Sequence, residues 1–190
     1  MLFRAQPDIV IQTVTYRPDD ADPMLWRIFS AMKAAEMVVV MAAGNHGPDA
    51  GRNYPPANLI RLYPFSVSTF SVGSVGQEDQ VSEFSARGPS AQNSSELFPQ
   101  IVAPGEDLTV AIPLMADALI RDSGTSYSVG YAAGAAAILL QAAPDLRPNA
   151  LEHLLKITAR SSAERKPDNS AGWGTLALTA ALKSLDAQLA

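Results

Sequence analysis

The first half of the chain alternates apolar segments of two kinds. Residues 8–16 (DIVIQTVTY) are rich in β-branched side chains and predict a strand. In residues 23–36 apolar side chains recur at helical spacing, which predicts an amphipathic helix with Asp22 as N-cap and Pro23 in its first turn. Residues 37–43 (MVVVMAA) form an unbroken apolar run, which is typical of a parallel strand covered on both faces. This order predicts a right-handed strand, helix, strand crossover.

Shorter patterns fill the middle of the chain. Glycine, proline and asparagine across residues 48–63 predict an irregular loop, after which residues 66–75 resume a strand pattern. Residues 86–99 predict a second loop. Residues 100–112 predict two short strands around a Pro-Gly turn, and residues 119–121 are a candidate for a third strand. Together with the helices, these strands indicate an α/β fold.

Residues 126–143 (SYSVGYAAGAAAILLQAA) are nearly all apolar or small. A helix that is apolar on all sides is expected to be buried, and Gly130 and Gly134, one turn apart, are expected to let another backbone approach closely. A transmembrane span is the competing interpretation, but the run is short, alanine-rich and interrupted by polar residues, so we predict no membrane span. Two amphipathic helices near residues 148–159 and 176–189 complete the chain.

Composition removes several classes of function. Fourteen basic and nineteen acidic residues give a net charge of -5. The sequence has no run of Lys or Arg that could bind the phosphates of a nucleic acid, so we expect no nucleic-acid partner. The absence of cysteine excludes disulfides and thiolate metal sites. The two histidines, His46 and His153, are far apart in the sequence, so no metal site is predicted. Residues 1–4 carry no secretory signal pattern.

Two polar residues stand where chemistry is expected. Asn45 follows the apolar strand of residues 37–43, and ligands of open α/β sheets bind beyond the carboxyl ends of strands. Ser126 opens the apolar helix, where free backbone N–H groups and the helix dipole would face an oxyanion. Each residue also has a structural explanation, as an N-cap for Ser126 and a turn residue for Asn45. The pair is more informative than either residue alone.

Five blocks in a fixed order carry a family resemblance. The chain resembles the C-terminal part of the catalytic domain of subtilisin-like (subtilase, peptidase S8) serine proteases. The matching blocks are VVVMAAGNHG (38–47), FSVGSVGQEDQVSEFSARGP (70–89), IVAPGEDLTV (101–110), GTSYSVGYAAG (124–134) and WGTLALTAAL (173–182). The resemblance implies a three-layer α/β fold with a mostly parallel sheet between helices. It also implies that residues 1–190 form a partial peptidase domain whose N-terminal strands are missing.

The resemblance also implies roles for individual residues. Ser126 would be the nucleophile, and Asn45 with the Ser126 N–H would form the oxyanion hole. Two residues of the strand over residues 8–16, which matches the family's substrate-pairing strand, and two residues of the 38–47 block would contact the substrate peptide: Thr13, Val14, Ala43 and Gly44. Calcium is common in the family, but no calcium ligands match here.

The base of the catalytic triad is the missing part. The family's catalytic aspartate and histidine lie upstream of the strand matched by residues 8–16, where this chain has almost nothing. His46 belongs to a turn and His153 to the polar face of a predicted helix, so neither fits the role. The acidic residues Asp49, Asp107 and Asp122 are predicted in loops or turns without a histidine partner. We therefore expect the chain alone to be nearly inactive.

Departures from the family pattern leave alternatives open. Gly130 and Tyr131 replace the family's proline and histidine, and residues 13–16 (TVTY) replace its Ser-Leu-Gly-Gly element. One hypothesis is a serine endopeptidase acting on peptides or proteins, with aspartate and histidine supplied by a missing N-terminal portion or a separate chain. Another is a non-catalytic module that binds a peptide or protein, and an unrelated α/β binding protein is a weaker third. An extracellular or cell-surface location is an expectation from the family alone.

Overall fold

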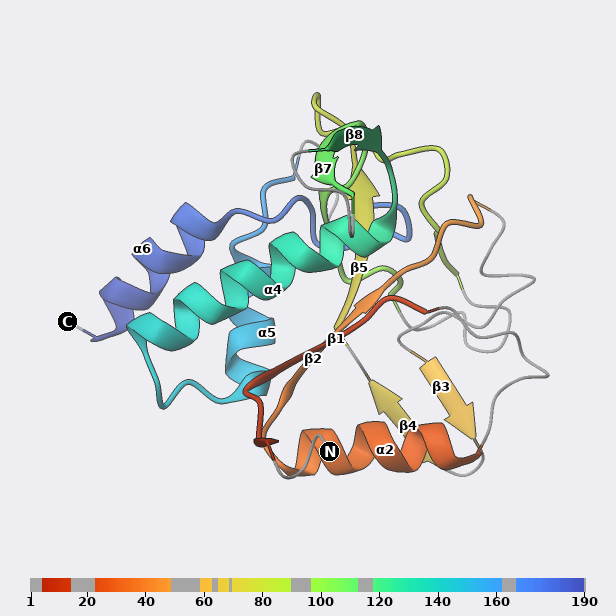
Figure 1. Ribbon diagram of the computed structural model, residues 1–190. Coiled ribbons are helices and arrows are strands. Elements are labelled where there is room, and N and C mark those ends of the chain that lie inside the picture. Colours follow the sequence, from red (N-terminus) through yellow and green to blue (C-terminus); the bar gives the residue numbers. More distant parts are fainter. Residues whose placement is uncertain are drawn as a thin grey trace.

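A parallel sheet forms the middle of the fold in the computed structural model (Figure 1). Its strands are ordered β1 (Ile9–Gln12), β2 (Val38–Ala42), β5 (Phe70–Val75) and β6 (Ile101–Pro104), and each neighbouring pair is parallel. The structure describes residues 5–14, 23–48, 59–62, 65–68, 70–89, 97–112, 118–161 and 167–189.

Helices cover both faces of the sheet, with α4 (Thr125–Ala142) on one side and α2 (Pro23–Ala34) on the other (Figure 1). Alternate residues of β2 divide between two apolar clusters, because successive side chains of a strand point to opposite faces. Val38 and Val40 pack in the α4 cluster, whereas Val39 and Met41 pack in the α2 cluster. The unbroken apolar run thus fills two cores, and the expected three-layer α/β fold is confirmed.

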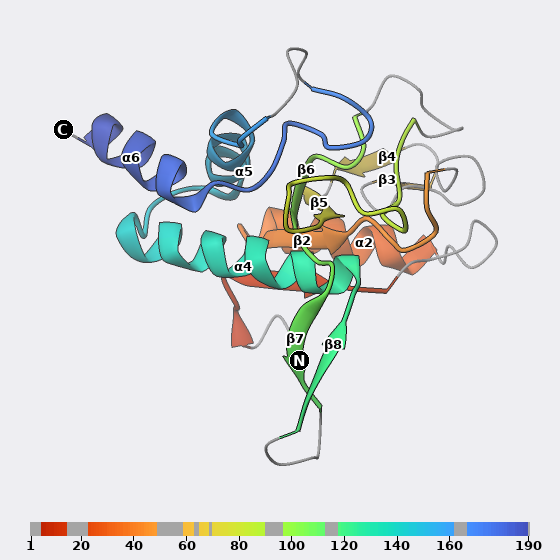
Figure 2. The same ribbon diagram turned by 90° about the horizontal axis from the view of Figure 1, so that it is seen from above.

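The remaining helices and hairpins surround this core. Helices α5 (Pro148–Ile157) and α6 (Leu178–Leu189) add side chains to the α4 cluster. Strands β7 (Leu108–Ala111) and β8 (Leu119–Asp122) form an antiparallel hairpin that projects away from the body of the molecule (Figure 2). This hairpin immediately precedes α4, so it lies beside the first turn of that helix.

Two predictions in the middle of the chain are wrong. Part of the loop predicted over residues 48–63 is strand β3 (Leu59–Leu62), which pairs antiparallel with β4 (Phe65–Ser68). The strand predicted over residues 66–75 is divided, because β4 and β5 belong to different sheets. Strand β3 was missed because its four residues follow a segment rich in glycine, proline and asparagine, which predicted a loop. The predicted N-cap Asp22 lies outside the described residues.

Helix α4 is buried on one face only, which corrects the prediction of a wholly buried helix. Val129, Ala132, Ala136 and Leu139 have no exposed surface, whereas Ile138 is 43% exposed. No described atom lies within 4 Å of a Cβ built on Gly130 or Gly134, so the expected close backbone approach is absent from the described part of the chain. Both faces of α4 carry apolar or small side chains, so the sequence does not show which face is exposed.

Strand β1 lies at the edge of the sheet, and no other described strand pairs with its outer side. Ile11 in this strand is 54% exposed. Because open apolar edges promote strand pairing between molecules, we expect Ile11→Lys to reduce self-association of the chain in light scattering. Leu119→Lys is the matched control, since Leu119 is 65% exposed on the projecting hairpin. Equal effects of the two substitutions would contradict association through β1.

Candidate active site

The structure brings together the two candidate residues from the sequence. Strand β2 ends at Ala42, and the chain turns at Gly44, whose φ of 107° favours glycine. Asn45 follows, and its Oδ1 accepts hydrogen bonds from the Thr125 backbone N–H at 3.0 Å and from the Thr125 hydroxyl at 2.8 Å. The residue after Thr125 is Ser126, which is exposed. The loop after β2 and the first turn of α4 are therefore joined directly.

These bonds decide which way the Asn45 amide faces. Its oxygen is engaged by Thr125, so the NH₂ group is left on the other side as a donor. Nδ2 lies 3.3 Å from the point where a Cβ at Gly124 would sit, and the Ser126 backbone nitrogen lies 3.9 Å from the same point. A side chain at Gly124 would therefore make a close steric contact with the Asn45 NH₂ group. The arrangement suits stabilisation of negative charge beside Ser126.

Sequence reasoning missed Thr125, which holds this geometry. The residue is 1% exposed, and its Oγ1 also accepts a hydrogen bond from the Gly44 N–H at 3.2 Å. A buried hydroxyl needs hydrogen-bond partners, so a threonine at the start of an apolar helix was the available signal. Thr125 thus fixes the orientation of the Asn45 amide through its hydrogen bonds.

The backbone at the start of α4 supplies a second donor. Gly124 precedes the helix and offers no side-chain cap, so the first N–H groups depend on other partners. The Thr125 N–H goes to Asn45 and the Tyr127 N–H to the Gly124 carbonyl. Among the described residues no group accepts a hydrogen bond from the Ser126 N–H. This N–H and the Asn45 amide can therefore both serve an oxyanion.

The turn before Ser126 is fastened to the loop after β6. The Gly124 N–H donates to the Gly105 carbonyl at 2.7 Å. A Cβ at Gly105 would lie 2.2 Å from Ser128 Oγ and 2.9 Å from the Gly124 carbonyl oxygen, so only glycine fits. The glycine of the Ala-Pro-Gly block thus allows the close approach that places Ser126.

Hydrogen bonds also join the β7–β8 hairpin to this turn. Tyr127 donates its hydroxyl to Asp122 Oδ2 at 2.5 Å, and the Ser123 N–H donates to Asp122 Oδ1 at 2.8 Å. The Asp107 N–H donates to Ser123 Oγ at 2.9 Å, and the Asp107 side chain forms an ion pair with Arg121. Asp122 is the last residue of strand β8, which corrects its predicted place in a turn. The other acidic candidate, Asp49, lies outside the described residues.

The hydrogen bond between Tyr127 and Asp122 shifts the pKa values of both side chains. It lowers the pKa of Asp122, with help from the Ser123 N–H, and it raises the pKa of Tyr127. The nearby charges of Asp107 and Arg121 are paired with each other. A lowered aspartate pKa contributes stability above its unfolded value, and a raised tyrosine pKa contributes below its own. The bond should therefore persist between about pH 4 and pH 10.

We expect the pKa of Tyr127 to fall when its acceptor is removed. In Asp122→Ala the phenol loses the carboxylate that favours its protonated form, so it should titrate nearer to an ordinary tyrosine. NMR titration of the ¹³Cζ-labelled side chain would measure this, with the Tyr127 signal assigned by its loss in Tyr127→Phe. An unchanged titration curve in Asp122→Ala would contradict the bond.

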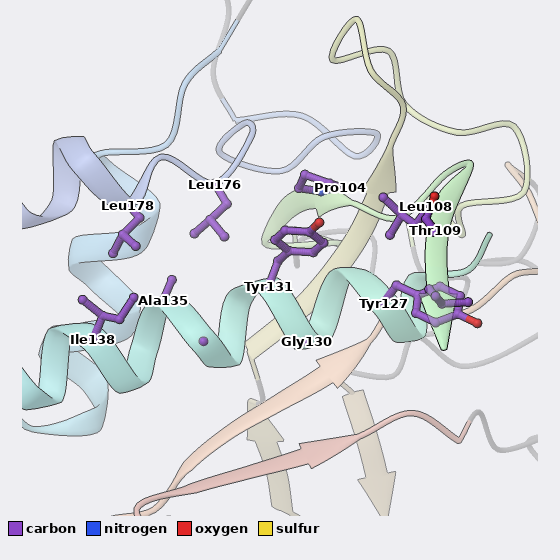
Figure 3. A pocket seen from close by; sticks show the side chains of 12 residues that line it. Pro104, Leu108, Thr109, Tyr127, Gly130, Tyr131, Ala135, Ile138, Leu176 and Leu178 are labelled. Carbon is purple, nitrogen blue, oxygen red and sulfur yellow. The ribbon is translucent and has the colours of Figure 1, made fainter. Parts of the chain in front are cut away.

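An apolar groove of about 660 Å³ runs along α4 (Figure 3). Tyr127 stands at one end and Ile138 at the other, with Leu108 and Leu176 on neighbouring segments. Tyr131, which takes the place of the family's histidine, is 50% exposed within it. The exposed face of α4 is therefore the floor of a groove that begins at Tyr127.

The other candidate residues lie at the same end of the sheet or on its surface. Gln12 of β1 is level with Met41 of the parallel strand β2, so the residues that follow both strands share one edge. Thr13 and Val14 are exposed there, whereas Ala43 is buried and Gly44 is exposed.

Both histidines are exposed, and His153 lies on α5, away from the first turn of α4 (Figure 1). The described residues include no group of three His, Cys, Asp or Glu side chains suited to a metal. They also include no helix long and apolar enough to cross a bilayer.

Comparison with known proteins identifies the family. The model of the subtilase family, Peptidase S8, matches residues 4–174. The chain belongs to the subtilase family. Mycosin-1 of Mycolicibacterium smegmatis is 32% identical over 174 residues, covering 80% of this chain and 37% of that protein. Serine protease AprX of Bacillus subtilis is 31% identical over 153 residues, covering 74% of this chain and 34% of AprX. This subtilase chain thus spans about a third of the length of both relatives.

Solved structures agree with this assignment. MycP1 from Mycobacterium smegmatis superposes with a TM-score of 0.70 and 28% identity, covering 95% of this chain and 52% of that one. The prenylagaramide maturation protease PagA has a TM-score of 0.76 and 22% identity, covering 97% of this chain and 64% of PagA, and shows the fold alone. The described architecture is therefore a subtilase serine protease domain, and the family acts on peptide or protein substrates.

Proposed function

We propose that this chain supplies the nucleophile and the oxyanion hole of a serine endopeptidase, whose aspartate and histidine come from outside these 190 residues. The observation that carries the proposal is the orientation of Asn45. Thr125 binds the amide oxygen twice, so the NH₂ group and the Ser126 N–H remain as donors at one place.

The chemistry follows from these groups. Ser126 Oγ attacks the substrate carbonyl, and the oxygen becomes an oxyanion that accepts hydrogen bonds from Asn45 and from the Ser126 backbone. A serine hydroxyl needs a base to take its proton, and the base needs a carboxylate to orient it. His153 is exposed on α5, away from this turn, so the base is proposed to come from a segment joined upstream or from a separate chain.

Complementation tests the proposal directly. The chain is co-expressed with an upstream segment that carries the family's aspartate and histidine motifs, and the complex is treated with a fluorophosphonate probe. We expect labelling in the complex, none in Ser126→Ala, and little in the chain alone. His46→Ala serves as a control, because His46 directly follows Asn45 and is not the proposed base, so its loss should not affect labelling. A folded complex without Ser126-dependent labelling would refute the proposal.

A second candidate is a module that binds peptides without cutting them. Its support is the exposed Thr13 and Val14, which replace the family's Ser-Leu of the substrate strand with two β-branched residues. This candidate predicts an upstream segment that lacks the aspartate or the histidine. Peptide binding by a complex that never labels at Ser126 would favour it.

Substrate contacts, calcium and location are further parts of the proposal. Thr13, Val14, Ala43 and Gly44 are proposed to line the peptide path, because they follow the two strands that end beside Asn45. Calcium stays a suggestion from the family alone. An extracellular or cell-surface location is proposed from the family, and the similar protein MycP1 comes from the ESX-1 type VII secretion system.

A further inference from the structure

The start of α4 lacks the usual helix cap. An N-cap side chain normally accepts a hydrogen bond from the N–H of the second or third helical residue. Here those residues are Ser126 and Tyr127, and the N-cap position is held by Gly124, which has no side chain. A serine or aspartate cap at Gly124 would compete for the Ser126 N–H, the backbone donor of the proposed oxyanion hole. The glycine keeps that donor free but leaves the helix end without its normal support.

A side-chain bond stands in for the cap. From the third helical position the Tyr127 hydroxyl reaches back to Asp122, two residues before Gly124, at 2.5 Å. In a capping box the residue at this position binds the backbone N–H of the N-cap. That route is closed here, because the Gly124 N–H already donates to the Gly105 carbonyl. Asp122 also accepts from the Ser123 N–H, so the bond closes the turn on its exposed side.

The two sides of the turn are therefore held by different groups. On the buried side Thr125 is bound to Asn45 through its N–H and its hydroxyl. On the exposed side the hydrogen bond between Asp122 and Tyr127 links the end of β8 to the first turn of α4. Ser126 lies between these two attachments, so its position depends on both.

We propose that Asp122 and Tyr127 are positioning residues whose hydrogen bond, the Asp122–Tyr127 clasp, replaces the N-cap and holds Ser126 while leaving its N–H to the substrate oxygen. The effect of the clasp on Ser126 rests on the proposed function. Its effect on the helix start does not, and the two parts are tested separately.

Hydrogen exchange tests the clasp in the chain itself. Tyr127→Phe removes only the hydroxyl, and Asp122→Ala removes the acceptor. Both should speed exchange of the Thr125 and Tyr127 amides by roughly three- to tenfold, the range that one hydrogen bond supports. Tyr131→Phe is the matched control, because Tyr131 lies one turn further along α4 and its hydroxyl makes no hydrogen bond to a described residue. Equal exchange in Tyr127→Phe and Tyr131→Phe would overturn the clasp.

The rate of Ser126 labelling tests the positioning role in the complemented protein. Tyr127→Phe and Asp122→Ala should slow fluorophosphonate labelling by roughly three- to tenfold with little change in the thermal midpoint. Asp122→Asn should restore most of the rate, because its amide oxygen still accepts from the phenol. Unchanged labelling despite faster exchange would overturn the positioning role. If the unsubstituted complex does not label at all, the proposed function fails, while the exchange experiment still decides the clasp.

Discussion

Replacing Asn45 with alanine in the complemented protein is expected to lower kcat for peptide hydrolysis by about 10²- to 10³-fold. The substitution removes the side-chain donor beside Ser126 and leaves the Ser126 N–H as the remaining donor. Because the lost hydrogen bond strengthens as charge develops on the substrate oxygen, KM should change little. Steady-state kinetics with a peptide substrate, measured on the folded complex, would give both constants.

Controls separate this effect from damage to the fold. Asn45→Ala also leaves the Thr125 hydroxyl without its acceptor, so the thermal midpoint must be compared. Thr125→Val keeps Asn45 but removes the hydroxyl that orients it, and we expect a smaller loss of kcat than in Asn45→Ala. His46→Ala, one residue from Asn45, should leave kcat unchanged. A change in KM alone after Asn45→Ala would contradict an oxyanion role.

The two residues of the candidate site could be predicted from the sequence, but the hydrogen bonds that orient them could not. Asn45 follows a strand that is apolar throughout and Ser126 opens an apolar helix, so both positions could be expected near one edge of the sheet. The orienting bonds of Thr125 could not be expected, because they join residues 80 apart in the sequence. The same holds for the contact between Gly105 and Gly124, which depends on how two loops meet.

Fold elements were predictable where packing and local pattern agree. The apolar run of residues 37–43 correctly predicted β2. That strand is buried on both faces, so every residue in it is apolar and the sequence pattern is unambiguous. The β3–β4 hairpin was missed because its strands have four residues each and follow a stretch of glycine and proline. Helix α4 shows the opposite failure, since a sequence that is apolar on every side does not say which side faces the sheet.

Two adjacent residues of α4 separate its faces experimentally. Leu139 has no exposed surface and packs in the cluster between α4 and the sheet, whereas Ile138 is 43% exposed beside the groove. Leu139→Ala is expected to lower the free energy of unfolding by about 2–5 kcal/mol, because it removes buried methyl groups and leaves a cavity. Ile138→Ala should cost about 0.5 kcal/mol or less, as is usual for exposed positions. Urea unfolding of the two variants would measure the difference.

The exposed face of α4 offers a surface that a complementing segment could cover. If a complementing segment packs on the exposed face, Ile138→Ala should become more costly in the complex than in the chain alone, since burial adds apolar transfer energy. Leu139→Ala should cost the same in both, because its surroundings are already complete. Similar losses for the two variants in the isolated chain would contradict the one-sided burial of α4, and with it the groove along its exposed face.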